Sequence, residues 1–524
     1  MNFLDLIHLD FLDLDDYPNV QLQLGIFTFV IFTVLIYKYF KHPFKLWQRL
    51  GIHGPEPKLI FGNVHEIYSP KGARAAYSKW QSQYGRRYGI YFFRMPALVI
   101  TDPEWIKHIF VKDFNNFRDR MSFDDNVLIN KEVLYGLFFA TGDVWKRIRG
   151  IMTPSFSVSK IKSMVAIVNR SAARLGEHVL KLAEEGTPWE AKLYCGAFAL
   201  DVVTGTGFSI DVDSVKNLNE PFTRHGRSLF IYKWGVQLLA ILVHSFPILM
   251  CHFYRLFGIA FFKSDDMKFF DRNIKQMIDQ RKEDKEKRND ILQNLMEAES
   301  DVVLQGGSGK LTSEELVAQG IMLFIAGYET ASSTLQFLLY ELATHKEVME
   351  KITAEIDDVI GDQEPTYDLC QNLNYIEATI NETLRMYPPL SVIHRECSKP
   401  TRLFDLDLPA KTAIIVPVYN LQRDPEYWKN PDEFNPDRFL AGSTSFEAYN
   451  PFTFMPFGHG PRLCIGMKLG MMKMKLAVVH IFKRIIITKA TPEILHINDF
   501  SSILQPSVPI TIHCAPREHQ KLVK

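Results

Sequence analysis

Residues 457–466 read FGHGPRLCIG, and this stretch says more about the chain than any other. It places Cys464 in a loop with three glycines and one proline, and Arg462 lies two positions before the cysteine. Because glycines let backbone N–H groups approach a thiolate closely, we expect Gly460 and Gly466 to do so here. A soft thiolate of this kind can bind iron and push electron density onto it. We therefore predict that Cys464 is an iron ligand, whereas a lone cysteine without such neighbours would be an ordinary buried residue.

A second informative segment, residues 326–332 (AGYETAS), lies inside a long apolar stretch. The stretch begins at Thr312, which can cap a helix together with Glu315, as in a capping box. The residues that follow are apolar almost all round, which is typical of a buried helix. Since no proline appears until Pro365, we predict a helix of about thirty residues and a second helix over about 345–360.

Two neighbouring side chains in this segment can take part in chemistry. Glu329 places a carboxylate in an apolar setting, where an acid is costly unless it has a partner or a task. Thr330 adds a hydroxyl beside it. A threonine inside a helix most often bonds its own backbone, so a purely structural role is the alternative for Thr330.

Together these segments resemble a known family. Residues 457–466 match the pattern Phe-x-x-Gly-x-Arg-x-Cys-x-Gly at every fixed position, and residues 326–330 match Ala/Gly-Gly-x-Asp/Glu-Thr. Both patterns are those of the cytochromes P450. The resemblance extends from about Leu50 to Cys514 and is strongest to the microsomal clan that oxidises xenobiotics and steroids. It implies a mainly α-helical fold with small β-sheets.

The resemblance also implies a cofactor, haem b, and the residues around it. Cys464 is expected to supply the axial thiolate to the iron. Thr330 is expected to hydrogen-bond dioxygen, and Glu329 to relay protons from solvent. Trp145 and Arg149 are four positions apart and therefore share one helix face, which suits a haem propionate. The residues expected to contact the haem are Trp145, Arg149, Arg395, Arg462 and Phe457, with Arg120 and His394 as alternatives at the propionates.

A further set of charged residues is expected to be structural. Glu382 and Arg385, three positions apart on one predicted helix, look like the family's Glu-x-x-Arg pair. Arg438 is expected to be the third member of a buried network, in which one carboxylate lies between two arginines. This network would hold the segment before the cysteine loop.

Composition and charge limit the possible functions. The chain has 524 residues, of which 47% are hydrophobic, and its 60 basic and 60 acidic residues cancel. Zero net charge argues against a nucleic-acid partner, because proteins that neutralise phosphates usually have a basic excess. The six cysteines are far apart and form no C-x-x-C pair, which excludes a disulfide scaffold and a zinc ribbon. This cysteine usage fits a reducing environment.

The N-terminus is predicted to be a membrane anchor. Tyr17–Tyr37 contains no charged residue, acidic residues precede it, and lysines and an arginine follow it. This length suits one spanning helix, and the positive-inside rule places the following body in the cytosol. The resemblance to the microsomal clan implies that the membrane is that of the endoplasmic reticulum. A cleaved signal peptide would need a basic start, which is missing. The expected organisation is a luminal N-terminus (1–16), the anchor (17–40), a basic and proline-rich linker (41–60) and a haem-thiolate monooxygenase domain (61–524).

Two further segments and the substrate pocket complete the predictions. Trp234–Met250 is apolar but contains His244 and Pro247, so we expect two short helices that dip into the membrane surface, with a buried core helix as the alternative. Arg281–Asp290 mixes both charge signs and is expected to be a solvated helix end and loop. The substrate pocket is expected to include Phe123, Leu128, Phe138, Phe324, Ala326, Val392 and Ile393.

The resemblance implies a monooxygenase that inserts one oxygen atom from O2 into a lipophilic substrate. Electrons would come from NADPH through NADPH-cytochrome P450 reductase, with cytochrome b5 as a second candidate donor, and Lys146, Arg147 and Lys468 would form the docking face. The main alternative is a haem-thiolate isomerase or dehydratase that acts on a lipid peroxide without external electrons. A non-enzymatic haem binder and a membrane-anchored interaction protein with a structural Cys464 are the remaining alternatives.

Overall fold

The computed structural model describes most of the chain. The described residues are 18–69, 71–121, 130–229, 262–284, 287–298, 309–443, 448–498 and 503–517. Trp234–Met250 and the pocket candidates Phe123 and Leu128 lie outside these ranges.

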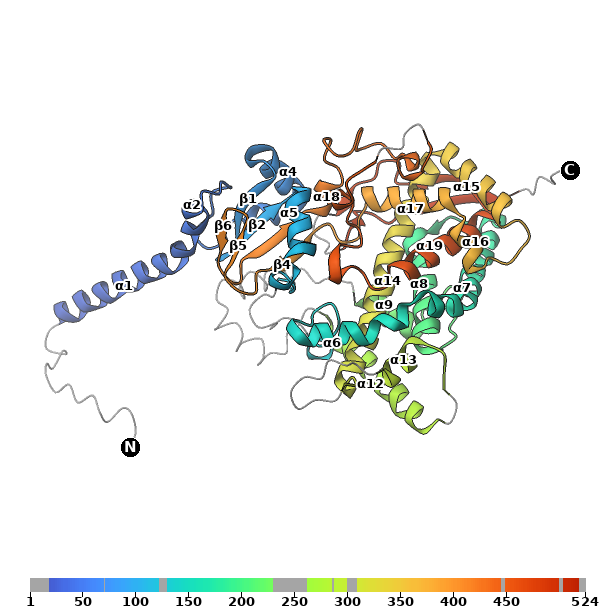
Figure 1. The fold of residues 1–524 in the computed structure, drawn as a ribbon, viewed down its shortest axis with the longest axis horizontal. Coiled ribbons are helices and arrows are strands. Elements are labelled where there is room, and N and C mark those ends of the chain that lie inside the picture. The colour runs from blue at the N-terminus through green and yellow to red at the C-terminus, as the bar shows by residue number, and fades with distance from the viewer. Residues whose placement is uncertain are drawn as a thin grey trace.

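Helices make up most of the structure, as predicted (Figure 1). The helices are α1 (Pro18–Lys41), α2 (Leu46–Arg49), α3 (Val64–Ile67), α4 (Gly72–Tyr84), α5 (Pro103–Lys107), α6 (Gly142–Met152), α7 (Val158–Glu184), α8 (Ala191–Phe208), α9 (Pro221–Ser228), α12 (Ser264–Glu283), α13 (Ile291–Glu297), α14 (Ser313–Thr344), α15 (Lys346–Val359), α16 (Tyr367–Gln371), α17 (Asn374–Met386), α18 (Val418–Leu421) and α19 (Met467–Phe482).

The strands form four small sheets among the described residues. The strands are β1 (Arg87–Phe92), β2 (Met95–Ile100), β3 (Trp189–Glu190), β4 (Ile393–Glu396), β5 (Thr401–Leu403), β6 (Leu406–Leu408), β7 (Ala413–Val416), β8 (Ile485–Thr491), β9 (Ile497–Asn498), β10 (Gln505–Pro506) and β11 (Thr511–Pro516). The largest sheet has the order β1-β2-β7-β4, in which only the β2–β7 pair is parallel. This sheet places Arg395 of β4 opposite Ile414 of the central strand β7.

The long central helix is α14, which has 32 residues. The predicted capping box is present, because Thr312 accepts a hydrogen bond from the Glu315 backbone and the Glu315 side chain accepts one from the Thr312 backbone. The helix packs along α8 and also contacts α12, α17 and α19. Most of its side chains are buried, so it lies in the core of the body, and α15 follows at once, as expected.

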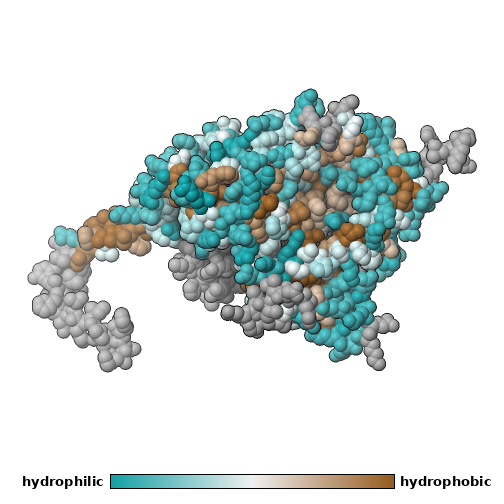
Figure 2. Space-filling model, viewed as in Figure 1, coloured by the Kyte–Doolittle hydropathy of each residue, from teal (hydrophilic) through white to brown (hydrophobic). Residues whose placement is uncertain are grey.

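The N-terminal helix α1 extends away from this body (Figure 1). Its apolar side chains from Leu22 to Tyr37 are exposed, and Figure 2 shows them as a continuous hydrophobic helix beside a mostly hydrophilic surface. Among the described residues, Leu22–Arg49 is the one helical segment that is long and apolar enough to cross a membrane. The exposure of so many apolar side chains requires a non-aqueous environment or a partner around α1.

The segment after α1, predicted as a linker, packs on the body. Trp47 is buried, and its indole Nε1 donates to the Ile90 carbonyl of β1 at 2.8 Å, while Phe40 is buried near the end of α1 itself. Gly89 leaves room for this indole, because a Cβ there would lie 2.3 Å from the Trp47 ring. The C-terminal end of α1 is therefore held close to the sheet.

The expectation that Arg281–Asp290 is wholly solvated is wrong at its two ends. Arg281 donates to both oxygens of Asp290, at 2.7 and 2.8 Å, and both side chains are buried. Asp290 also caps α13 and accepts a hydrogen bond from Ser209. This mixed-charge segment therefore contains one buried ion pair, Arg281–Asp290, which joins the end of α12 to the start of α13.

Candidate functional site

The cysteine loop lies directly before α19. The Cys464 backbone N–H donates to the Phe457 carbonyl at 2.9 Å, and the Leu463 N–H donates to the Gly460 carbonyl at 2.9 Å. These bonds close the loop, and Phe457 packs half-buried against the main apolar cluster. The Gly466 N–H bonds the Cys464 sulfur, as predicted.

Gly460 is needed for a different reason from the one expected. Its φ is +70°, and a Cβ there would lie 1.9 Å from the Phe110 carbonyl oxygen. No side chain other than that of glycine fits, because both the backbone conformation and the space forbid a Cβ. Gly460 thus lets the loop approach the backbone at Phe110, while Gly466 supplies the N–H to sulfur.

The Cys464 sulfur lies among positive charges. The side chain is accessible, yet enough protein surrounds it for burial to raise the pKa of the thiol. The Gly466 N–H and the guanidinium groups of Arg149 and Arg120 oppose that effect and favour the thiolate. These groups therefore favour the anionic form that a metal ligand requires.

An arginine cluster surrounds this loop with little negative charge nearby, and its members are Arg120, Arg149, Arg395 and Arg462. Arg395 is 1% exposed, and burial, followed by Arg120 and Arg462, holds its pKa well below the usual range. Burial and Arg120 also lower the pKa of Arg462 to about 9, and burial lowers that of Arg120 to about 10. Asp119 partly compensates, since its Oδ1 lies 3.3 Å from an Arg462 nitrogen.

Several guanidinium nitrogens of this cluster have no partner among the described residues. They are the buried Nε atoms of Arg120 and Arg395 and both Nε and Nη1 of Arg462. Buried, unpaired donors on cationic groups are costly, so the cluster requires an anion. The two propionates expected of haem have the right charge and geometry for such guanidinium groups.

Trp145 and Arg149 are placed by α6. The guanidinium of Arg462 lies 4.4 Å from the centre of the Trp145 ring, and Trp145 is 4% exposed. The Arg149 guanidinium lies close enough to Cys464 for its charge to lower the pKa of the thiol. The predicted shared face is therefore present, and the stacking of Arg462 on Trp145 is a contact that spacing did not predict.

His394 and Arg395 are neighbours on β4 and differ in charge. Burial, followed by the charges of Arg120 and Arg395, lowers the pKa of His394 to about 4, so the imidazole is neutral near pH 7. A neutral imidazole is the weaker partner for a carboxylate. Arg395 thus remains the charged member of β4 in this cluster.

Residues 326–332 of α14, named the distal segment here, place the side chains of Glu329 and Thr330 against different partners. Glu329 is 1% exposed and pairs with Lys192 of α8, and Gln505 of β10 donates to the same oxygen at 2.5 Å. Thr330 is half-buried, and its hydroxyl donates to the Ala326 carbonyl at 2.6 Å. The two side chains therefore have different partners, and Thr330 makes the backbone bond that was the alternative to a functional role.

The cysteine loop and α14 share apolar contacts. Ile465, next to the cysteine, packs against the cluster that contains Met322 and Tyr328 of α14. Phe324, predicted in the pocket, instead lies in an aromatic cluster and stacks on Phe208 with ring centres 4.9 Å apart. That prediction was wrong because Phe324 lies on the other side of α14 from exposed Ala326.

The predicted Glu-x-x-Arg network is confirmed. Glu382 and Arg385 are fully buried and joined by two hydrogen bonds of 2.7 and 2.9 Å. Arg438 Nε donates to Glu382 at 3.1 Å, and the Asn435 backbone donates at 2.9 Å. Arg385 also donates to the Gln422 carbonyl at 2.9 Å. The network joins α17 to the segment before the cysteine loop.

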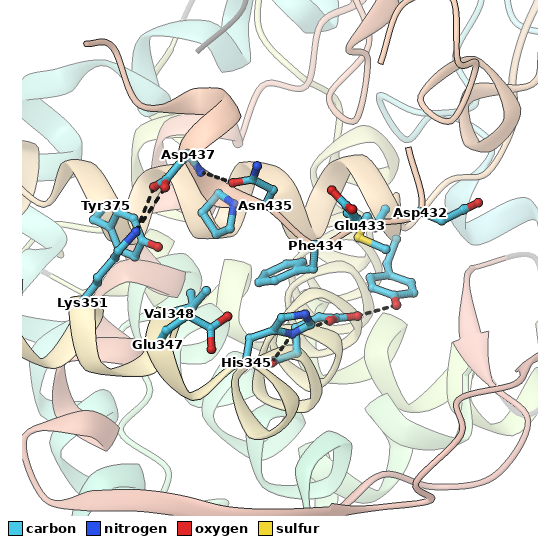
Figure 3. A pocket seen from close by; sticks show the side chains of 14 residues that line it. His345, Glu347, Val348, Lys351, Tyr375, Asp432, Glu433, Phe434, Asn435 and Asp437 are labelled. Carbon is cyan, nitrogen blue, oxygen red and sulfur yellow. Dashed lines mark hydrogen bonds and ion pairs between the residues drawn. The ribbon is translucent and has the colours of Figure 1, made fainter. Parts of the chain in front are cut away.

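A separate surface hollow of about 620 Å³ lies beside this network (Figure 3). Several of its polar side chains are paired with one another: Tyr387 and His345 bind Glu341, and Lys351 binds Asp437 at 3.1 Å. None of the buried polar side-chain atoms without a partner belongs to the residues that line it, among those described. The hollow thus lacks the unpaired groups that distinguish the arginine cluster.

Some site residues had no signal in the sequence. Lys192 and Gln505 are far from every motif along the chain, and only folding brings them to Glu329. Asp119 is next to Arg120, but nothing in the sequence indicates its contact with Arg462. Arg147, predicted on a docking face, is buried and paired with Glu315. A basic run on a helix contains inward-facing positions, which a count of charges does not reveal.

Comparison with known proteins places these features in context. The family model described as Cytochrome P450 matches residues 52–513. Cytochrome P450 3A29 of Sus scrofa is 36% identical over 490 residues, which cover 93% of this chain and 95% of that protein. Cytochrome P450 3A11 of Mus musculus is 33% identical, with 93% and 95% covered, and cytochrome P450 3A5 of Homo sapiens is 32% identical, with 96% and 99% covered.

Proposed function

This chain belongs to the cytochrome P450 family and is a haem monooxygenase, and from that premise we propose that Cys464 supplies the axial thiolate of the haem iron. The observation that supports this most is the combination of an accessible sulfur, an N–H donor from Gly466 and two nearby guanidinium groups. When bound, the haem supplies activation of dioxygen, which thiolate ligation favours.

We propose that Arg395, Arg462, Arg149 and Trp145 hold the haem propionates, with Arg120 as a further donor. The unpaired nitrogens of the arginine cluster support this role, since each can donate to a carboxylate oxygen. The stacking of Arg462 on Trp145 keeps the guanidinium plane oriented while it donates. Phe457 would pack against the haem from the loop.

Thr330 and Glu329 of α14 are proposed to handle protons. Thr330 would release its bond to the Ala326 carbonyl and donate from Oγ1 to dioxygen in the site. Glu329 can hold a proton at its carboxylate, and the partly exposed Lys192 beside it connects that carboxylate to solvent. Exposed Ala326 leaves space beside Thr330 for a lipophilic substrate.

We further propose that electrons come from NADPH through NADPH-cytochrome P450 reductase, with cytochrome b5 as a second donor. Lys146 and Lys468 are exposed and remain candidates for docking, whereas buried Arg147 does not. Residues 17–40 would anchor the chain in the endoplasmic reticulum membrane with the domain 61–524 in the cytosol. The exposed apolar face of α1 supports an anchor.

The carbon monoxide difference spectrum of the reduced protein tests the proposal. Wild type and Cys514→Ser should give a strongly red-shifted Soret band, since Cys514 lies on β11, outside the loop. Cys464→Ser should lose that band. A red-shifted band that persists in Cys464→Ser would exclude this ligand. Turnover of a lipid peroxide without NADPH and reductase would favour the isomerase or dehydratase instead.

A further inference from the structure

Lys473 is a buried lysine without an acidic partner. It lies on α19, is 4% exposed, and pairs with no carboxylate among the residues that the structure describes. Burial alone lowers its pKa to about 7, so the amine can shed the charge that would be costly there. Burying an amine without an acidic partner lowers the stability of the folded protein, which suggests that this position has a role.

The Lys473 amine donates to the Gly327 carbonyl of α14 at 2.6 Å. Gly327 belongs to the distal segment, between Ala326 and the Glu329–Thr330 pair. On another side, Gly327 is pressed by α8, because a Cβ there would lie 2.4 Å from a Val203 methyl group. The helix is thus held at this residue between α8 and α19.

The backbone of α14 is unusually rich in side-chain hydrogen bonds at this point. The carbonyls of Ala326, Glu329 and Thr330 accept bonds from hydroxyl groups of α14 itself. Such bonds compete with the helical ladder and bend a helix. Of these four carbonyl groups, only that of Gly327 accepts its bond from another element, since Lys473 lies on α19. The Lys473 bond can therefore fix a part of α14 that is otherwise easy to deform.

We propose that Lys473 is a positioning residue for Thr330, the residue proposed above to donate a proton to dioxygen. Its bond to Gly327 ties α19, which follows directly from the cysteine loop, to the turn of α14 that presents Thr330. The contact joins the two helices, which lie side by side (Figure 1). Loss of the bond lets this turn relax, so that the Thr330 hydroxyl is no longer held where it donates a proton.

This inference rests on the proposed function, and it predicts where electrons go in the enzyme without added substrate. Two electrons and two protons convert dioxygen into hydrogen peroxide, whereas four of each convert it into two waters. When proton delivery by Thr330 is disturbed, more NADPH is consumed in forming peroxide.

The test compares Lys473→Met with Lys475→Met in the full chain, reconstituted with reductase in phosphatidylcholine vesicles. Methionine has a similar length, and replacing a lone buried amine by an apolar group preserves the packing. Lys475 is a matched control, because it is also buried on α19 but binds the Cys370 carbonyl and Glu377, away from α14. Lys473→Gln retains a donor and serves as the conservative variant.

Two readouts, backbone hydrogen exchange over residues 326–332 and peroxide formed per NADPH, decide the matter. In Lys473→Met, exchange should rise about five-fold, the effect of one ordinary hydrogen bond on a local opening equilibrium, and the peroxide fraction should rise with it. Lys475→Met should resemble wild type, and Lys473→Gln should fall between.

Several results would overturn the inference. These are wild-type values in Lys473→Met, equal changes in Lys475→Met, or loss of haem in both Lys473 variants, which would make the role one of folding. Failure of the proposed function is separate, because it appears as a missing red-shifted band in wild type itself.

Discussion

Glu329 is held between a lysine and a glutamine that come from two different elements. Lys192 lies in the first turn of α8, and Gln505 lies in β10, so the Glu329 carboxylate links both elements to α14. A buried carboxylate with a cation and an amide donor is satisfied, which explains how an acid persists in an apolar helix.

Removal of this cation should be costly. In Lys192→Met the Glu329 carboxylate stays buried without a positive partner, and we expect a loss of at most about 3 kcal/mol, below that of fully buried pairs because Lys192 is 20% exposed. Thermal loss of the haem absorbance measures this. The double variant Lys192→Met/Glu329→Gln should recover much of the stability, and equal losses in both variants would contradict a direct pairing.

Asp201 gives a pH-dependent prediction. It is buried on α8, where it accepts hydrogen bonds from the Ser214 N–H, and burial raises its pKa to about 7. Between the ordinary aspartate pKa near 4 and this value, the folded protein keeps a proton that the unfolded chain releases. The contribution of Asp201 to stability is therefore full below about pH 4 and falls as pH rises to about 7.

Asp201→Asn removes this titration. The stability of wild type relative to Asp201→Asn should fall between pH 4 and 7 by about 1.4 kcal/mol for each unit between the two pKa values, and stay level above pH 7. Thermal midpoints of both proteins at several pH values measure the difference, in which the other titrating groups cancel. A difference that does not change with pH would contradict the raised pKa.

The start of α14 is an element whose stability depends on local chemistry. Thr312→Ala removes the bond to the Glu315 N–H and should cost about 1 kcal/mol, the usual effect of losing such a cap. Ser313→Ala is the control, because Ser313 is exposed and does not cap the helix. Equal midpoints for the two variants in thermal unfolding would show that the cap contributes nothing.

Glu315 has a second role in the same element. It is buried and pairs with Arg147 of α6, whose guanidinium also donates to the Lys310 carbonyl at 3.1 Å. The start of α14 is therefore tied to the helix that presents Trp145 and Arg149. The pairing with Glu315 gives a reason for a basic residue at position 147, which does not face solvent.

At the level of the entire chain, we expect that most of α1 can be removed without unfolding the body. Arg94 donates to the Tyr39 carbonyl at 3.1 Å and lies over its ring, so the junction begins near Tyr39. A chain that lacks residues 1–38 should keep its red-shifted carbon monoxide band. It should lose its attachment to phosphatidylcholine vesicles, because the apolar surface of α1 is gone.

Flotation of vesicles with the full and shortened chains measures this. The full chain should float, and the shortened chain should stay largely in the aqueous fraction. Unchanged flotation of the shortened chain would place the main membrane contact elsewhere on the body.

The sequence alone could predict features that depend on neighbours along the chain. The loop around Cys464, the Glu329–Thr330 step and the capping box at Thr312 are local patterns, in which fixed spacing gives each residue its backbone setting. Helical periodicity likewise predicted α14 and α15, because burial all round and the absence of proline leave few other solutions.

Contacts between distant segments needed the folded chain. Nothing along the sequence joins Lys192 to Glu329 or Lys473 to Gly327, since these pairs are separated by more than a hundred residues and no spacing rule connects them. The side of each helix that faces inward was also open, as buried Arg147 and Phe324 illustrate. Packing alone chooses those faces, because a side chain's partners depend on how whole helices dock and not on its neighbours in the chain.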